Sequence, residues 1–543
     1  MHVDAIVTGR FHTGIPDRPE AHTLAIHHGR IVAVDDVEGL TSRARHDFGD
    51  KRIVPGFHDA HHHHAFTGQR LAMVDLRYPA VTNLDEAYAA IAERAASLPA
   101  GAWVKGTGYD QNRLGGHPTA EGLDAVTGGR PAIIEHVSGH MVVANTAAFE
   151  LAGAPGREGF DDIPGGRVIR DSDGRAEGLL QETAANPIRL LAGDISEAEI
   201  EETLRLASEQ SISYGLTSVT EPGILAGGTM GTNSPVVASY QAAIEKGLVK
   251  PRLTVMPFHQ VLHELEHGAE GWKTLDMGIR TGLGDDRLRF GPVKIISDGS
   301  LIGRSAAVHD CYCGEPDNYG VMQLSPEELH EAILAYHRAG WTVATHAIGD
   351  RAIDAVLDAV AEAQRQFPRE ARHRIEHFAI ATDAQVARCA ELGVIPVPQG
   401  VFISEFGDGI LDALGPERTA GTYRMRSLLD AGMVVPGSTD SPVSDANPLK
   451  SIHDLVNRRT ASGAEFAPAE RVTIAEAVAA YTYGSAYAVG RETDVGTLAP
   501  GMLADFAVLD RDVFTIPSEE IEQTEVVATV IGGEVVYGDP HTA

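Results

Sequence analysis

The chain has 543 residues, 43% of them hydrophobic and 22% charged, which is the composition of a globular protein with a large core. A formal net charge of −32 at pH 7 disfavours nucleic acid and anionic membranes as partners, because so acidic a surface repels polyanions. The three cysteines are too few for a disulfide framework, no apolar run has the length of a membrane span, and the N-terminus lacks a basic-plus-apolar leader. We therefore expect a cytoplasmic protein, and the sequence is compatible with a homo-oligomer.

Both ends of the chain have the pattern of short β-strands. Near the N-terminus the apolar segments 23–26 and 31–34 flank His28-Gly29-Arg30, which is typical of a hairpin turn. Near the other end, residues 526–536 form a second strand pair around Gly532-Gly533. Two β-rich ends around a different middle predict one small β-sandwich with residues 1–56 and 486–543 as its two parts.

The middle of the chain alternates strand and helix patterns, which indicates an α/β protein with a parallel sheet. Capping boxes at Ser196, Ser325, Thr382 and Thr473 mark helix starts, and 349–367 carries an amphipathic helix pattern. Eight strands with intervening helices predict a (β/α)8 TIM barrel. The predicted strands are 57–61, 216–221, 253–258, 290–297, 342–346, 374–378, 394–397 and 434–438.

One interval does not fit a simple barrel. The distance from His63 to Leu216 is much longer than one helical crossover needs. Residues 65–195 are rich in Gly and Pro and contain short strands, so they are predicted to form an inserted subdomain after strand 1. Strand 1 then occupies 57–64, and the rest of the barrel occupies 196–485.

The stretch from Pro55 to His63, PGFHDAHHH, is the one around which the other motifs are arranged. Read as a strand, it places His61 and His63 on one side, about 7 Å apart by strand rise. Two imidazoles so placed can bind one metal ion. A polar His-rich turn is the alternative for this pattern alone, and a one-residue shift would present His62 and His64 instead.

Four further candidate ligands lie at the ends of other predicted strands: Lys294, His346, His377 and Asp440. Each alone has a simpler explanation as a hydrogen-bonded loop residue or, for Lys294, a packed lysine. Lys294 lies in an apolar run, where a buried amine would be partly neutral at pH 7. A neutral amine can take up carbon dioxide to become a carbamate, an anionic ligand able to bridge two metals. Together with His61 and His63, these residues make a ligand set for one or two divalent ions.

With these motifs in place, the sequence resembles the amidohydrolase superfamily, and specifically its YtcJ-like branch, which includes N-substituted formamide deformylases. The resemblance covers nearly the whole chain and is carried by motifs that occur in a characteristic order. They are Pro55-Gly56-Phe57-x-Asp59-x-His61-x-His63, Val293-Lys294-Ile295-x-x-Asp298-Gly299-Ser300, His346-Ala347-Ile348-Gly349-Asp350, Arg374-Ile375-Glu376-His377, Gly437-Ser438-Thr439-Asp440-Ser441-Pro442 and Gly496-Thr497-Leu498-x-Pro500-Gly501. One departure is that His62 and His64 flank the expected ligands.

The resemblance implies a metal-dependent enzyme that hydrolyses a C–N bond, other than a peptide bond, of a small molecule. It assigns the metal-ligand roles to His61, His63, Lys294, His346, His377 and Asp440, and we expect one or two zinc ions. In the mechanism that fits such a site, Asp440 takes the proton of the attacking water and delivers it to the leaving nitrogen. His377 or His140 would stabilise the oxyanion, although His140 is equally compatible with a buried loop histidine.

Substrate contacts are expected from Tyr109 and His140 of the insertion and from Asp298 and Arg304 after strand 4. The insertion leaves the barrel at its catalytic face, so it could fold over the barrel mouth and exclude water, or else pack outside the barrel. A lactonase or another ester hydrolase that uses the same site is the alternative activity. A non-catalytic metal-binding barrel is a further alternative.

Overall fold

The computed structural model describes residues 1–78, 80–136, 141–164, 166–193, 196–225, 235–266 and 271–539. The chain divides into two compact units. The first unit comprises Met1–His64, Ser208–Ala226 and Val236–Ala543, and the second comprises Ala65–Ala207 and Gly227–Pro235. Among the described residues, no helix combines the length and apolarity needed to cross a membrane.

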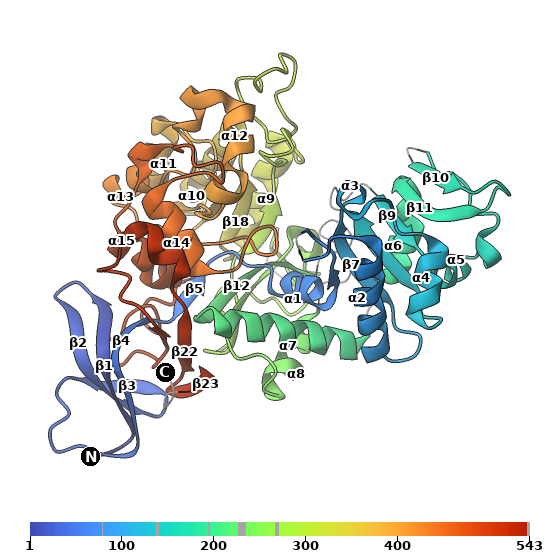
Figure 1. Ribbon diagram of the computed structural model, residues 1–543. Helices are drawn as coiled ribbons and strands as arrows, with labels where there is room; N and C mark the ends of the chain where they lie inside the picture. Colours follow the sequence, from blue (N-terminus) through green and yellow to red (C-terminus); the bar gives the residue numbers. More distant parts are fainter. Residues whose placement is uncertain are drawn as a thin grey trace. The chain divides into compact units, whose positions relative to one another are not determined.

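The two ends of the chain share one seven-stranded sheet within the first unit, and its N-terminal strands lie beside β22 and β23 (Figure 1). Hydrogen bonding links all seven strands, which come from both predicted parts of the sandwich, into a single sheet. Its core contains apolar residues from both ends of the sequence, for example Phe11 and Phe506. The order is β23 (Glu534–Gly538), β22 (Val526–Ile531), β21 (Phe506–Leu509), β4 (Thr41–Pro55), β1 (His2–Ile15), β2 (Arg18–His27) and β3 (Arg30–Val34).

Two tight turns in this sheet require left-handed backbone. His28 and Gly29, between β2 and β3, have φ of 51° and 73°, and Gly532 and Gly533, between β22 and β23, have φ of 58° and 81°. Two successive residues with positive φ are the signature of the type I′ turn, whose twist matches that of the flanking strands. The hairpins expected from the sequence are therefore present.

The rest of the first unit has a TIM-barrel-type α/β fold whose parallel strands fall into two four-stranded sheets. The predicted strand 290–297 is divided at Gly291-Pro292, because proline has no N–H for a ladder bond. The first sheet has the order β16 (Leu288–Phe290), β13 (Arg252–Pro257), β12 (Leu216–Ile224) and β5 (Phe57–Asp59). The second has the order β17 (Val293–Ile296), β18 (Val343–Ala347), β19 (Arg374–His377) and β20 (Ile395–Val397).

The predicted eighth strand, 434–438, was wrong, because the structure assigns no strand there. The segment that follows is nevertheless bonded on both sides. Ser438 forms an isolated parallel bridge with Gln399, just after β20. On the other side, Ala60 N–H donates to Gly437 O at 3.0 Å and Asp440 N–H donates to His61 O at 2.8 Å. Residues 437–440 are thus held directly beside the loop after β5.

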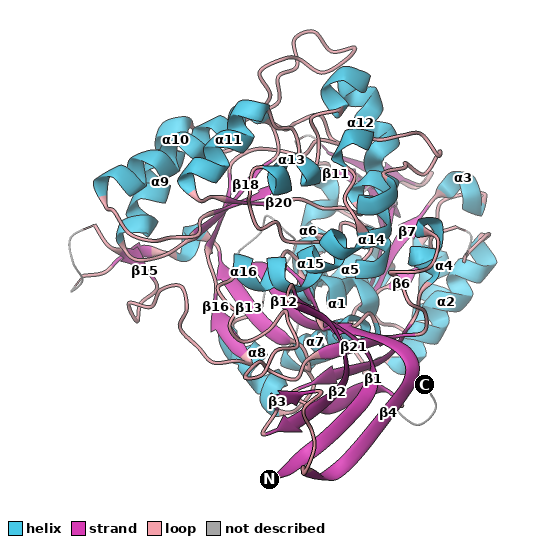
Figure 2. Cartoon of the chain, turned by 90° about the vertical axis from the view of Figure 1, so that its left-hand side faces the viewer, coloured by secondary structure: helices cyan, strands magenta, loops and turns pink. Residues whose placement is uncertain are grey.

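Helices follow most of these strands, and α9, α10 and α11 lie outside β18 (Figure 2). The four predicted capping boxes form: Ser196, Ser325, Thr382 and Thr473 each accept a backbone N–H three residues later, and the Glu or Gln there bonds back. The helices of this part are α7 (Glu197–Ser213, shared with the second unit), α8 (Val237–Glu245), α9 (Pro326–Arg338), α10 (Asp350–Gln366), α11 (Asp383–Leu392), α12 (Phe402–Thr419), α13 (Met425–Asp430), α14 (Pro448–Asn457), α15 (Ile474–Ala479) and α16 (Ser485–Ala488).

The second unit is an α/β structure with its own six-stranded mixed sheet and two apolar clusters. The strand order is β10 (Gly166–Arg170), β11 (Ala176–Glu182), β9 (Met141–Ala144), β8 (Ala132–His136), β7 (Val104–Tyr109) and β6 (Val74–Asp75). Its helices are α1 (His64–Ala72, which begins in the first unit), α2 (Leu84–Ser97), α3 (Gln111–Leu114), α4 (Ala120–Thr127), α5 (Thr146–Leu151) and α6 (Asn186–Ala192).

Candidate metal centre

His61, His63 and Asp440 converge in the interior of the first unit. Asp440 Oδ1 lies 3.3 Å from His61 Nε2 and 3.2 Å from His63 Nε2. The three ligand atoms all lie within 4.8 Å of one another, and all three side chains are buried. Asp440 has a φ of 61°, a left-handed conformation that is uncommon for residues other than glycine.

The two histidines are brought together by a turn and not by strand alternation. β5 ends at Asp59, so His61 and His63 follow the strand. The buried Asp59 carboxylate accepts the backbone N–H of His61 at 3.0 Å and that of Thr439 at 3.1 Å. Asp59 therefore fastens the histidine turn to the segment that carries Asp440, two regions that lie far apart in the sequence.

Glu376 and Arg374 hold the His61 ring. Glu376 Oε2 forms a short hydrogen bond with His61 Nδ1, and Arg374 donates from Nε and Nη2 to the two Glu376 oxygens at 2.8 Å each. Burial alone would raise the pKa of Glu376, but Arg374 and His61 hold it well below its usual range. The ionised carboxylate fixes Nδ1 of His61, which directs Nε2 towards Asp440.

His377 and His346 extend the cluster. The His377 ring centroid lies 5.0 Å from that of His61 and 4.5 Å from that of His346. His377 Nδ1 hydrogen-bonds to Gln399 Oε1 at 2.9 Å, and His346 Nε2 hydrogen-bonds to Gly299 O at 3.0 Å. Each ring thus has one nitrogen held by a neighbouring oxygen, which leaves the other nitrogen as the ligand atom.

Lys294 lies at the centre of this group. Its Nζ is 3.4 Å from His61 Nε2, and its side chain is buried on β17. Burial lowers the pKa of the amine to about 8, although Glu376 and Asp440 favour the charged form. A larger neutral fraction makes this amine more nucleophilic than an exposed lysine.

The imidazoles are in the form that binds metals. Burial lowers the pKa of both His63 and His346 to about 4, so both rings are neutral at pH 7. Burial would raise the pKa of Asp440, but the neighbouring His61 and His63 hold it well below its usual range. A cluster of neutral imidazoles around an ionised carboxylate is a donor set that suits a divalent cation. The residues present therefore fit the metal that the sequence predicts.

The alternative register of the histidine run does not reach Asp440. Each ring nitrogen of His62 and His64 is buried and lacks a hydrogen-bond partner among the described residues. The two rings lie near each other, with centroids 5.7 Å apart. His61 and His63, and not His62 and His64, belong with Asp440 to a group whose ligand atoms are close enough to hold a metal ion.

Two residues expected to contact substrate have other partners. Asp298 is completely buried and accepts N–H groups of Ala307, Ile348 and Gly349 at 2.9–3.1 Å, so it ties the loop after β17 to the loop after β18. Burial raises the pKa of Asp298 to about 7 in spite of these bonds. Arg304 pairs with Glu315 at 2.7 Å and also with Asp412. Arg304 thus holds loops, whereas Asp298 also lies 3.4 Å from His346 Nε2, beside the candidate metal ligands.

Of the two substrate contacts predicted in the insertion, the structure describes Tyr109. Tyr109 is buried in an apolar cluster of the second unit, and its hydroxyl bonds to His117 Nδ1 at 3.0 Å. A core position replaces the predicted substrate contact, because the ring is enclosed by neighbouring apolar side chains. His140 lies outside the described residues.

The residues that orient the centre were missed as functional groups. Asp59, Arg374 and Glu376 belong to motifs that were recognised, but no role was assigned to them. Gln399, which orients His377 and is itself held by Val397 O and Ser438 Oγ, lies outside those motifs. Its one sequence signal is its place directly after a predicted strand.

The chain matches the model of the amidohydrolase family over residues 46–537. LONG AFTER FAR-RED 3 of Arabidopsis thaliana is 30% identical over 98% of this chain and 91% of its own length. The putative amidohydrolase YtcJ of Bacillus subtilis is 28% identical over 89% of each chain. N-substituted formamide deformylase of Arthrobacter pascens is 29% identical over 94% of this chain and 91% of its own length.

A solved structure supports the same assignment. The crystal structure of an uncharacterized metal-dependent hydrolase from Pyrococcus horikoshii has a TM-score of 0.76 and 25% identity, and the match covers 95% of this chain and 99% of that chain. Sequence, fold and the buried His/Asp cluster agree. The chain is a hydrolase that belongs to the amidohydrolase family, in its YtcJ-like branch.

Proposed function

We propose that this protein is a metal-dependent hydrolase of small molecules that cleaves a non-peptide C–N bond of the amide or formamide type. The observation that carries the proposal is the convergence of His61, His63 and Asp440, with ligand atoms within 4.8 Å of one another in a buried site. The amidohydrolase family and the formamide deformylase relative support the bond type.

His61, His63, Lys294, His346, His377 and Asp440 would hold one or two divalent ions, with zinc as the expected metal because imidazole and carboxylate ligands suit it. A divalent cation in such a site polarises the substrate carbonyl and lowers the pKa of water from about 15.7 towards 7. The protein supplies fixed ligand directions, since neighbouring oxygens hold His61, His346 and His377.

Asp440 is the proposed proton carrier. Its Oδ1 faces His61 and His63, whereas Oδ2 has no hydrogen-bond partner among the described residues. The free oxygen can accept a proton from the attacking water and return it to the leaving nitrogen, which completes the hydrolysis without a change in net protonation. His377, beside His61 and His346, is the candidate for stabilising the developing oxyanion.

Lys294 is the proposed carbamate. Its amine would attack carbon dioxide to form an N–C bond, with release of one proton and gain of an anionic oxygen donor. The change of sign is important because an ammonium 3.4 Å from His61 Nε2 repels a metal that a carbamate would attract. Lys294→Ala should lose metal and activity, and added acetate should partly restore both. Wild-type metal content and rate in Lys294→Ala would show that this residue is only a packed lysine.

The activity is tested with the metal-loaded protein on matched substrates. A series of N-substituted formamides and simple amides is compared with lactones and esters of similar size, and kcat/KM is measured for each. Faster turnover of the formamides and amides supports the proposal. Preferential turnover of lactones would replace it with an ester hydrolase, and metal binding without turnover of any substrate would indicate a non-catalytic metal-binding barrel.

A further inference from the structure

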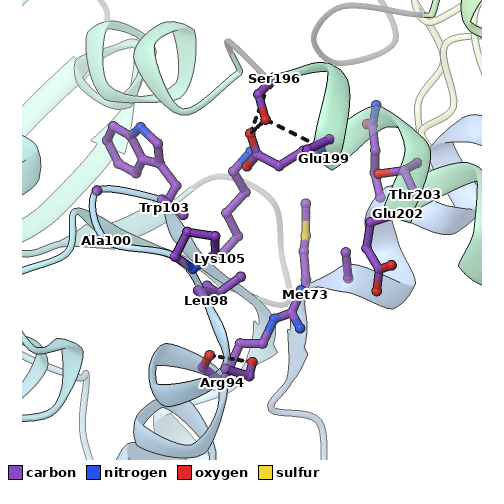
Figure 3. A pocket seen from close by; sticks show the side chains of 17 residues that line it. Met73, Arg94, Leu98, Ala100, Trp103, Lys105, Ser196, Glu199, Glu202 and Thr203 are labelled. Atoms are coloured by element: carbon purple, nitrogen blue, oxygen red, sulfur yellow. Dashed lines mark hydrogen bonds between the residues drawn. The ribbon is translucent and has the colours of Figure 1, made fainter.

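The second unit contains a cavity that the hydrolytic site does not use. It has a volume of about 550 Å³, within the range typical of small-molecule sites. It is enclosed by the end of α1, the end of α2, the loop 98–103, β7 and the first turns of α7, all within the second unit (Figure 3). We name it the Trp103 pocket after its one aromatic lining residue.

The walls of the Trp103 pocket are mostly apolar. Met73, Leu98 and Pro99 line it together with Trp103, and Figure 3 labels Met73, Leu98 and Trp103 among the lining residues. Such a lining can bury a ring or a short aliphatic body, and the indole face offers a stacking surface.

Two cations line the pocket, each near a carboxylate of the same lining but without a direct ion pair to it among the described residues. Lys105 on β7 and Arg94 on α2 line the cavity, and neither has a hydrogen-bond or ion-pair partner for its charged group among the described residues. Burial lowers the pKa of Lys105, and nearby Glu199 opposes this effect. An unpaired, partly desolvated ammonium gains more from an anion than an exposed one does.

The two carboxylates of the lining are already engaged. Glu199 Oε2 accepts the N–H of Ser196 at 2.9 Å and its hydroxyl at 2.8 Å, as the capping group of α7. Glu202 accepts both Nε and Nη2 of Arg205, at 2.8 Å and 2.7 Å. Glu202 is thus paired with Arg205, whereas Glu199 keeps its charge near Lys105, and the N-terminal end of the 17-residue helix α7 adds positive potential to the pocket.

We propose that the Trp103 pocket binds a small organic anion, that is, a carboxylate or sulfonate carried on an apolar ring-sized body. The anionic group pairs with Lys105 and Arg94, and the ring packs against Trp103 and Met73. This site is distinct in its residues from the centre around Asp440, and the inference does not depend on the substrate of the hydrolase.

The probe for the test is 8-anilino-1-naphthalenesulfonate, which combines an aromatic body with one negative charge. N-phenyl-1-naphthylamine has the same body without the charge and serves as the neutral comparison. Binding of each is followed by probe fluorescence and by quenching of tryptophan emission in the full-length protein. Trp103→Phe should remove the part of the quenching that arises in the pocket.

Lys105→Met and Arg94→Met keep side-chain length and remove the charge. Each should weaken binding of the anionic probe about tenfold or more, the value of one charge-assisted hydrogen bond, and leave the neutral probe unchanged. Lys105→Arg should restore anionic binding. Lys51→Met on β4, in the first unit, is the matched control. Benzoate should displace the anionic probe, and benzyl alcohol should not.

The proposal is overturned if the anionic probe binds Lys105→Met and Arg94→Met as tightly as wild type, because the cations then contribute nothing. It is also overturned if both probes weaken equally, since the loss would then come from the shape of the pocket and not its charge. Unchanged hydrolase activity and circular dichroism show that each variant has kept its fold.

Discussion

The histidines around the end of β5 are a natural comparison of two environments. His61 and His63 face Asp440, and Glu376 holds the His61 ring. His62 and His64, the neighbours in the same run, have no hydrogen bonds to their ring nitrogens among the described residues. Residue type and sequence context are almost the same, so the direction of each side chain and its partners decide the role. Hydrogen-bonded partners orient a buried imidazole as a ligand, whereas a buried ring without hydrogen bonds costs stability, although His62 still has the Asp59 carboxylate 3.6 Å away.

The largest expected effect comes from the carboxylate at which the two ligand histidines meet. Asp440→Asn keeps the shape and one oxygen ligand but removes the proton acceptor. We expect metal content to be retained and kcat to fall by about 10²–10⁴-fold. Metal analysis and steady-state kinetics on the metal-loaded protein check this, with the exposed Asp430→Asn on α13 as the control. Near-wild-type turnover by Asp440→Asn would move the role of base to another residue, with His377 as the next candidate.

A smaller loss is expected from the partner of His61. Glu376→Gln preserves size but removes the charge that fixes His61 Nδ1. Metal affinity or activity should fall by about 10–100-fold, the usual consequence of removing a group that orients a metal ligand. Competition with a chelator of known affinity measures the affinity of the protein for the metal. If the metal affinity and the activity of Glu376→Gln both match wild type, the contact between Glu376 and His61 does not orient His61 as a metal ligand.

The histidine that faces away from the centre should appear in the pH dependence of stability. His58 Nε2 bonds to Thr220 Oγ1 at 3.0 Å, and burial lowers its pKa from 6.5 to about 3. Below pH 6.5 the unfolded chain binds a proton that the folded chain excludes, so stability falls as pH decreases from 6.5 towards 3 and is unaffected above 6.5. The slope for one histidine is about 1.4 kcal/mol per pH unit.

His58→Gln keeps a partner for Thr220 and removes this titration. At pH 5 the variant should take up one proton fewer on unfolding, as measured by calorimetry in buffers of different ionisation enthalpy. Its denaturation midpoint should also decline less steeply than that of wild type between pH 6.5 and 5. Equal proton uptake by the two proteins would mean that His58 is charged in the folded state.

The smallest effect is expected at His64, one of the two histidines whose buried ring nitrogens have no hydrogen bonds among the described residues. His64→Leu puts an apolar side chain of similar volume in place of this ring. Stability at pH 7.5 should increase by about 1 kcal/mol, and kcat/KM should change little. Urea denaturation of the metal-free protein measures the first quantity. A clear loss of stability would reveal a polar partner for His64, and His61→Leu, which should lose metal, is the contrasting variant.

The sequence alone was sufficient for the local features. Hairpin turns at His28-Gly29 and Gly532-Gly533 and capping boxes at four helices depend on interactions between residues close in the chain, so a short pattern specifies them. The apolar stripe of α10 likewise predicted its buried face. These local patterns predict the same turn, cap or buried helix face whatever the tertiary fold around them.

The tertiary structure decided which candidates meet. The turn after β5, and not strand alternation, directs His61 and His63 to Asp440, because Asp59 joins it to Thr439. The predicted eighth strand is replaced by single bonds from residues 437–440 to both neighbours. Asp298 and Tyr109 have polar side chains suited to a substrate, yet one holds two loops and the other lies in a core. Contacts between distant segments, which no local pattern encodes, separate a ligand from a structural residue of the same type.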